Sequence, residues 1–168
     1  MDDPYPHHRP NAGVVMFNMD ALVWIGRRAD VEGDHVWQFP QGGMDDGEDA
    51  ESAARREAYE ETGARSDDLV LLGSIDRWLA YDFPAGLPAR PDQKRYRWKG
   101  QKQRWFAFRY TGRDADFDLT AVPPQEFAEW RWERLENVPP LIIHWKRGVY
   151  DEVAQEFARF ASSSNSGR

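Results

Sequence analysis

Short apolar runs, several of them alternating with polar residues, recur along this chain and are typical of β-strands. They predict strands at residues 13–17, 22–25, 37–39, 70–73, 104–110 and 129–132. A short polar turn separates the first two runs, so we expect these to form a hairpin. Pro40 ends the third run, because proline cannot donate a hydrogen bond to a neighbouring strand. Trp130 and Trp132 lie two residues apart in the last run and should share one face of the sheet.

Two helices are predicted, one inside the chain and one near its end. Asp49 suits the N-cap and Gly63 the C-cap of a helix near residues 50–62. A stripe of small residues along this helix would allow close packing on a sheet, and it consists of Ala50, Ala53, Ala54 and Ala58. The terminal helix is indicated by apolar residues at helical spacing, namely Val149, Val153, Phe157 and Phe160.

Strands mixed with one internal and one terminal helix predict an α/β sandwich. The chain of 168 residues suits one domain, which we place at residues 1–161. Residues 162–168 are rich in serine and predict a disordered tail.

Composition excludes several kinds of chemistry. The chain has no cysteine, which rules out disulfides, thiolate catalysis and zinc held by cysteine. No apolar run approaches the roughly 20 residues that span a membrane, and no signal or lipidation motif is evident. The four histidines show no metal-ligand spacing. We therefore expect a soluble, cytoplasmic protein that does not bind membranes.

Residues 90–104 carry seven cationic side chains and one acid, although the net charge of the chain is −7. Tyr96 and Trp98 lie among these cations. Cations interleaved with aromatic rings suit a surface for a nucleotide or for single-stranded RNA. A solvated, charged loop would give the same pattern. Three prolines between residues 83 and 100 predict that this region is a long, mobile loop.

Three carboxylates of the internal helix carry the most specific signal. Glu57, Glu60 and Glu61 are spaced so that they share one helix face, where like charges repel. A divalent cation would remove this repulsion. Mg²⁺ prefers oxygen ligands and binds through a few carboxylates together with substrate phosphates. The helix is therefore predicted to hold metal against a phosphate chain.

These acids belong to a longer pattern of fixed spacing, which consists of Gly42, Glu48, Arg56, Glu57, Glu60, Glu61 and Gly63. The pattern resembles a complete Nudix box, the mark of hydrolases that cleave a nucleoside diphosphate linked to another group. Ala58 and Ala64 fill the two positions that are usually aliphatic. The resemblance implies an α/β/α sandwich with a mixed central sheet, and a cofactor that is Mg²⁺ or Mn²⁺.

Within the box we assign roles to seven residues. Glu57 and Glu61 are the first choices as metal ligands, and Glu60 is either a third ligand or the base that deprotonates water. Arg56 can orient Glu60 through a charge-assisted hydrogen bond, and Glu48 pairs with Arg56 as a structural contact. In similar enzymes the backbone carbonyl at the position of Gly42 also contacts metal. Gly63 is structural.

Four stretches outside the box extend the resemblance to nearly the whole chain, from about residue 9 to about residue 157. They lie at residues 8–11, 37–43, 100–106 and 126–132. They resemble the bacterial RNA pyrophosphohydrolases and the related asymmetrical diadenosine tetraphosphate hydrolases. By this resemblance Glu126 joins the metal cluster or serves as the base. Read alone, Glu126 is a surface acid before a strand.

The same resemblance implies residues that bind substrate. These are Arg9, Arg28, Gln41, Gly43, Tyr81, Lys102, Gln103, Trp145 and Lys146. Tyr81 matches a tyrosine associated with dinucleoside polyphosphates, and Trp145 matches an aromatic residue that stacks on the terminal base of RNA. From the residues alone, either ring could equally belong to the core.

The leading hypothesis is a metal-dependent hydrolase that shortens the 5′ triphosphate of RNA to a monophosphate. The rival hypothesis is cleavage of diadenosine tetraphosphate to ATP and AMP. A third is a non-catalytic nucleotide sensor, although such proteins usually lose the acids that this chain keeps. No pattern identifies an activating protein partner, the oligomeric state or the phosphorus that is attacked.

Overall fold

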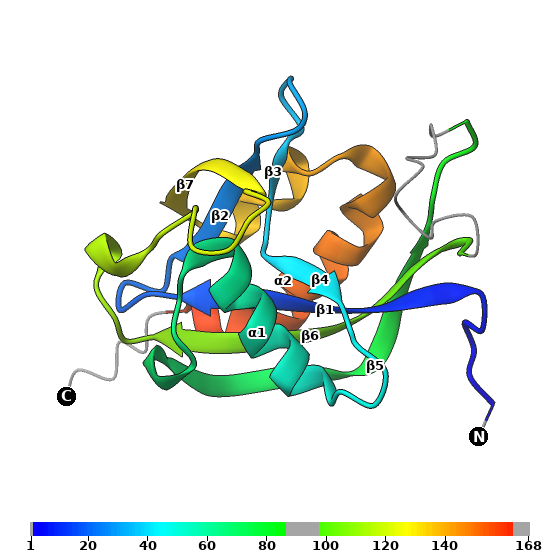
Figure 1. Ribbon diagram of the computed structural model, residues 1–168, viewed down its shortest axis with the longest axis horizontal. Coiled ribbons are helices and arrows are strands. Elements are labelled where there is room, and N and C mark those ends of the chain that lie inside the picture. Colours follow the sequence, from blue (N-terminus) through cyan, green and yellow to red (C-terminus); the bar gives the residue numbers. More distant parts are fainter. Residues whose placement is uncertain (1, 87–97, 163–168) are drawn as a thin grey trace.

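We describe a computed structural model of the protein, which covers residues 2–86 and 98–162. Within these residues seven strands form one sheet, in the order β3-β2-β1-β6-β5, with β4 paired to β1 and β7 paired to β2 (Figure 1). The strands are β1 (His8–Phe17), β2 (Val23–Arg28), β3 (Trp37–Gln38), β4 (Gln41–Gly43), β5 (Leu69–Asp82), β6 (Gly100–Tyr110) and β7 (Phe127–Glu133). The sheet is mixed, because β1 and β6 run parallel while the other pairs are antiparallel.

The helices α1 (Ala50–Thr62) and α2 (Arg147–Ala161) cover opposite faces of the sheet. The alternation of side chains along β1 explains the two cores. Val14 and Met16 pack in one cluster with the alanines of α1, whereas Val15 and Phe17 pack in the other with α2. The structure is therefore the predicted α/β/α sandwich with a mixed sheet.

Helix α1 has the predicted ends. The Asp49 side chain accepts a hydrogen bond from the Ser52 N–H, and Gly63 adopts a left-handed conformation with φ of 78°. The Gly63 N–H donates to the Tyr59 carbonyl. Ala53, Ala54 and Ala58 are fully buried, as the small-residue stripe predicted, so α1 lies close to β1 and β6.

The predicted hairpin is confirmed only at its turn. β1 and β2 pair only at Phe17 and Val23, after which β2 leaves β1 and runs along β7. Several strands are longer than the apolar runs suggested. β1 begins at His8, and β5 continues to Asp82 through irregularities in its pairing with β6. Strand β4 was not predicted, because its three residues are polar or glycine.

The end of the chain follows the prediction as far as the structure describes it. Three short 3₁₀ helices, Leu135–Asn137, Pro139–Leu141 and His144–Lys146, lead into α2. Val149, Val153 and Phe157 of α2 are buried, and Phe160 is half-buried. Trp130 and Trp132 both pack against Phe117, as expected for one face. The predicted tail from residue 163 and most of the predicted loop, residues 87–97, lie outside the described residues. No helix among the described residues is long and apolar enough to cross a membrane.

Candidate active site

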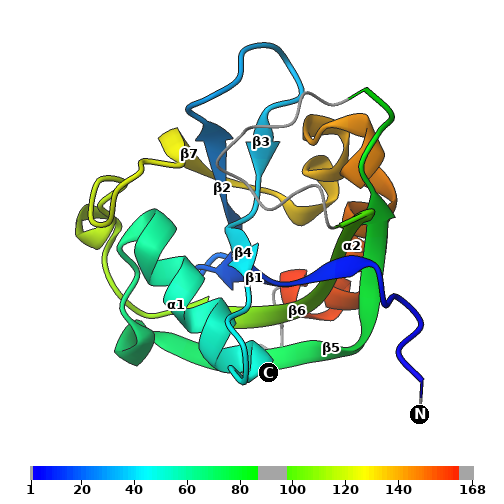
Figure 2. The same ribbon diagram turned by 45° about the vertical axis from the view of Figure 1, so that its right-hand side comes forward.

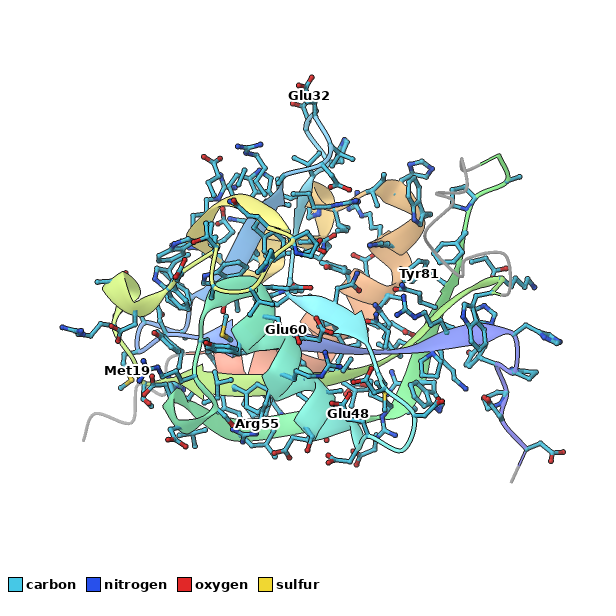
Figure 3. All side chains as sticks on the ribbon, in the orientation of Figure 1. Met19, Glu32, Glu48, Arg55, Glu60 and Tyr81 are labelled. Carbon is cyan, nitrogen blue, oxygen red and sulfur yellow. The ribbon has the colours of Figure 1, made fainter. Side chains whose placement is uncertain are left out.

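A cleft of about 510 Å³ lies where α1, β4 and the ends of β1, β2 and β5 meet. Strand β4 lies against both β1 and α1 (Figure 2), and all three of its residues line the cleft. Glu60 of α1 and Tyr81 near the end of β5 mark its two sides (Figure 3). The cleft therefore brings together residues that lie far apart in the sequence.

Four glutamates line the cleft. Glu57, Glu60 and Glu61 come from α1, and Glu126 comes from the segment before β7. Burial raises the pKa of Glu57 and, more strongly, that of Glu61. The negative charges of Glu57 and Glu126 raise the pKa of Glu61 further. These groups would hold their charge more easily beside a cation.

The backbone of β4 fits closely around these acids. The Gln41 N–H donates to Glu61 Oε2 at 3.1 Å, which fixes one oxygen of the most buried carboxylate. Gly42 lies against Glu57, and a Cβ atom built on Gly42 would be 2.0 Å from Glu57 Cδ. Only glycine allows this approach.

Arg56 connects α1 with the loop that follows β4. Its Nε and Nη2 atoms donate to the two Glu48 oxygens at 2.9 Å each, and Nη2 also donates to the Gly43 carbonyl at 2.8 Å. Its Nη1 atom donates to Glu57 Oε1 at 2.8 Å and to Glu60 Oε2 at 3.3 Å. Glu48 and Arg56 thus form the expected ion pair, which lowers the pKa of Glu48 and raises that of Arg56.

The donor set suits a hard divalent cation, since it consists of carboxylates and backbone carbonyls. Among the described residues, however, no three acidic or histidine side chains already converge closely enough to hold one ion. Glu57 is engaged by Arg56, and Glu126 is exposed.

The cleft is also lined by cationic and aromatic side chains. Arg9, Arg28 and Lys146 line it together with Tyr81 and Trp145. Arg28 is held by Asp30 through two hydrogen bonds of 3.1 and 2.7 Å. Lys146 Nζ lies 5.6 Å from the centre of the Tyr81 ring. Negative phosphates and a flat base would find complementary surfaces here.

Two residues that were predicted to contact substrate lie outside the cleft wall. Lys102 is 7% exposed, forms an ion pair with Asp3, and lies 4.8 Å from the centre of the Trp78 ring. Gln103 is buried, donates to Asn11 and Gln41, and accepts a hydrogen bond from the Trp105 indole at 3.2 Å. Side chains alternate along β6, so the Lys102 side chain points away from the cleft. Gln103 holds the Gln41 side chain through a hydrogen bond.

Other residues of the cleft wall were missed. Asn11, Gln38 and Gln101 line it, and Gln101 accepts a hydrogen bond from the Tyr81 hydroxyl at 2.5 Å. Gln38 is 6% exposed, and its Oε1 atom has no hydrogen-bond partner among the described residues. All three lie in stretches that carried the family resemblance. The signal that could have found them is strand alternation, which places Gln101 opposite to Lys102.

Residues 7–153 match the model of the NUDIX domain, and the chain belongs to this family. Curated relatives resemble it over nearly their whole length. An RNA pyrophosphohydrolase of Caulobacter vibrioides is 51% identical over 94% of this chain and 90% of its own. An RNA pyrophosphohydrolase of a Bradyrhizobium species is 48% identical over 95% of this chain and 96% of its own.

Solved structures share the fold at lower sequence identity. The dihydroneopterin triphosphate pyrophosphohydrolase of E. coli superimposes with a TM-score of 0.65, at 21% identity, over 89% of this chain and 98% of its own. An Ap4A hydrolase of C. elegans, solved as a binary complex, superimposes with a TM-score of 0.60, also at 21% identity, over 89% and 96%. These likenesses support the sandwich architecture.

Proposed function

We propose that this protein is an RNA pyrophosphohydrolase, which uses Mg²⁺ or Mn²⁺ to remove pyrophosphate from the 5′ triphosphate of RNA. The observation that carries the proposal is the cleft itself, in which buried carboxylates face cations and aromatic rings. The names of the similar relatives support the substrate class. In the reaction, water adds to a phosphorus, an anhydride bond breaks, and the products are pyrophosphate and RNA with a 5′ monophosphate.

Glu57, Glu61 and the Gly42 carbonyl would hold the cation, with Glu60 or Glu126 as a further ligand. A divalent cation neutralises phosphate oxygens and lowers the pKa of water, which is the chemistry that hydrolysis of an anhydride needs. The remaining carboxylate of the pair Glu60 and Glu126 accepts the proton of the attacking water.

Arg56 and Gln41 are positioning groups. The Arg56 guanidinium keeps Glu57 and Glu60 on the cleft side of α1, and the Gln41 N–H fixes Glu61. Since the guanidinium is also bound by Glu48 and by the Gly43 carbonyl, α1 and the loop after β4 keep one relative position. Preorganised ligands of this kind cost little reorganisation during the reaction.

Arg9, Arg28 and Lys146, which line the same cleft as the acids, bind the phosphates, and Gly43 leaves room for Arg9. A Cβ atom on Gly43 would lie 2.3 Å from Arg9 Nη2. The half-buried ring of Trp145 supplies a flat surface for a base. Tyr81 is 7% exposed and belongs to the hydrophobic core, the second of the two alternatives that its sequence left open. We do not extend this proposal to Lys102, whose ammonium group is engaged by Asp3.

A second candidate substrate is diadenosine tetraphosphate. The half-buried ring of Trp145, which lines the cleft, favours it, because adenine stacks readily on such a ring. With this substrate the four glutamates of the cleft would have the same roles as with RNA.

We also propose that residues 1–161 form one soluble domain that acts in the cytoplasm, where its RNA substrate is made.

The test is hydrolysis of 5′-triphosphorylated RNA and of diadenosine tetraphosphate, each with Mg²⁺ and with Mn²⁺. We expect RNA with a 5′ monophosphate as the product, at a higher kcat/KM than for the dinucleotide. Glu57→Gln should lower kcat for RNA by at least about 10³-fold while the protein stays folded. Equal loss in Glu51→Gln, which changes a carboxylate in the first turn of α1, would contradict the assignment.

A further inference from the structure

A series of amide groups connects the core of the sheet with the cleft. Gln103 of β6 is 1% exposed and is hydrogen-bonded to Trp105, Asn11 and Gln41. Asn11 of β1, which is opposite Gln103 in the parallel pairing, and Gln41 of β4 both line the cleft. The mechanism above uses the backbone N–H of Gln41, but it leaves these two side-chain amides without a role.

Trp105 determines which way the Gln103 amide faces. The Trp105 indole N–H donates to Gln103 Oε1 at 3.2 Å. An indole nitrogen can only donate, so the oxygen of the Gln103 amide must face Trp105 and its nitrogen must face the other way. The indole is itself fixed, because it is fully buried with ring centres 5.8 Å from that of Phe39 and 5.6 Å from that of Tyr150.

Gln103 in turn fixes the direction of two amides in the cleft. Its Nε2 atom donates to Asn11 Oδ1 at 3.0 Å and also to Gln41 Oε1. With both oxygens held at Gln103, the nitrogens of the two amides are turned away from it. Because both side chains line the cleft, these N–H groups are the part of each amide that is available to a ligand there.

Two neutral donors suit the oxygens of a polyphosphate. Ionised phosphate oxygens accept hydrogen bonds, and bonds to an ionised acceptor are stronger than those between neutral groups. The four glutamates of the cleft repel phosphate and, when ionised, have no proton to donate. Amide donors therefore favour a phosphate chain without adding charge beside the proposed metal ligands.

We propose that Asn11 and Gln41 bind phosphate oxygens of the substrate through their side-chain amides, and that Gln103 is the positioning residue that holds both in the donating orientation. This inference rests on the proposed function, in which the phosphates are the 5′ triphosphate of RNA. Gln103 does not touch the substrate, yet a reversal of its polarity reverses that of two groups in the cleft.

Gln103→Glu tests this polarity, and Gln103→Met is the matched control that removes it. A carboxylate at position 103 only accepts, so the Trp105 indole and both cleft amides can donate to it, and the amide oxygens then face the phosphates. We expect KM for 5′-triphosphorylated RNA to rise by at least about 10²-fold in Gln103→Glu, or about tenfold for each lost hydrogen bond. In Gln103→Met, where the amides are free to turn, KM should rise by about tenfold, and kcat should be nearly unchanged in both variants.

A purely structural role of Gln103 predicts the opposite order. Gln103→Glu keeps the size of the side chain and the three hydrogen-bonded neighbours, whereas Gln103→Met loses all three hydrogen bonds. A structural defect would therefore be larger in Gln103→Met, and melting curves of both variants measure it. A larger rise of KM in Gln103→Met than in Gln103→Glu overturns the proposal.

Asn11→Ala separates the orientation of the amides from the charge that Gln103→Glu adds. If Gln103 acts through the amides, Gln103→Glu should raise KM by only about tenfold when Asn11 is already absent, because one of the two amides has gone. A charge that acts through space would raise KM by the same factor with and without Asn11. That result would also overturn the proposal.

Nuclear magnetic resonance of the side-chain amides gives a readout that does not depend on turnover. The probe is inorganic pyrophosphate with Mg²⁺. In the unaltered protein the amide proton signals of Asn11 and Gln41 should shift during the titration, whereas the signal of Gln155, which is exposed on α2, should not. Gln103→Glu should abolish both shifts.

The outcomes separate this inference from the proposed function. If triphosphorylated RNA is hydrolysed but pyrophosphate shifts neither amide signal, the pair of donors is wrong and the proposed function stands. If both signals shift but triphosphorylated RNA is not hydrolysed, the proposed function is wrong, whereas the amides do bind phosphate.

Discussion

The carboxyl group of Glu57 lies so close to Gly42 that any side chain on Gly42 would displace it. The distance from a Cβ atom at Gly42 to Glu57 Cδ would be 2.0 Å. This contact joins β4 to α1 at the point where the proposed metal ligands meet. The requirement for glycine in the Nudix box therefore has a steric cause in this chain.

Gly42→Ala should displace the Glu57 carboxylate and lower kcat/KM by about 10²-fold or more, because small displacements of positioning groups have effects of this size. The measurement is steady-state hydrolysis of triphosphorylated RNA together with a melting curve. Gly148→Ala, where a Cβ atom meets open space, serves as control and should retain activity. Normal activity in Gly42→Ala would show that Glu57 tolerates displacement.

The Arg56 network should stabilise the fold as well as the site. Glu48→Gln replaces a carboxylate that accepts two hydrogen bonds from Arg56 and one from the Asp45 N–H, and we expect a loss of about 1–2 kcal/mol in the free energy of unfolding. The pKa of Glu48 is lowered in the folded state, so its contribution is present above its usual value of 4.5 and disappears as the pH falls through the lowered value. Denaturant unfolding of both proteins at pH 7 and at pH 3 measures this. If the two proteins differ in free energy of unfolding by as much at pH 3 as at pH 7, the ionised form of Glu48 is not the source of the stabilisation.

In the absence of metal, the charge of Glu61 should destabilise the fold, whereas that of Glu48 stabilises it. The pKa of Glu61 is raised in the folded state, so the ionised carboxylate destabilises the apoprotein. This destabilisation decreases as the pH falls through the raised pKa toward 4.5, because the carboxylate is then protonated. Glu61→Gln should therefore raise the melting temperature of the chelator-treated protein at pH 8, by a few degrees, and have less effect at pH 5. It should also reduce stabilisation by added Mn²⁺. If Glu61→Gln is less stable than the unaltered protein at pH 8, the charge of Glu61 does not destabilise the apoprotein.

Two buried lysines allow a matched comparison, because Lys146 lines the cleft and Lys102 does not. Lys146→Gln should raise KM for triphosphorylated RNA by about tenfold, the usual effect of a lost charge-assisted hydrogen bond. Lys102→Gln should change KM by less than about twofold but lower stability, since Asp3 and Trp78 lose their partner. Steady-state kinetics and melting curves of both variants test this, and equal effects on KM would restore Lys102 as a substrate contact.

Features fixed by local sequence were predictable. The ends of α1 depend on Asp49 and Gly63, which cap the helix through their own hydrogen bond and backbone conformation. The apolar alternation of β1 predicted a buried strand, and the spacing of the acids predicted that they share a face. The family resemblance then supplied the mixed sheet and the relation of Glu126 to α1.

Features that depend on tertiary pairing were not predictable. β2 leaves β1 after a single pair because β7, about a hundred residues later, offers a longer partner. β4 has no apolar residue to reveal it, and pairing with β1 makes it a strand. Lys102 looked like a phosphate contact because its charge is visible in the sequence, whereas the face of β6 on which it lies depends on strand register.

The most direct test of the central claim is the binding of Mn²⁺ followed by electron paramagnetic resonance, with the unaltered protein, Glu57→Gln and Glu51→Gln. Glu51 lies on the same helix but forms an ion pair with Arg55 outside the cleft. The account predicts that Glu57→Gln weakens Mn²⁺ binding by at least about tenfold, whereas Glu51→Gln binds like the unaltered protein. Unchanged affinity in Glu57→Gln would contradict it.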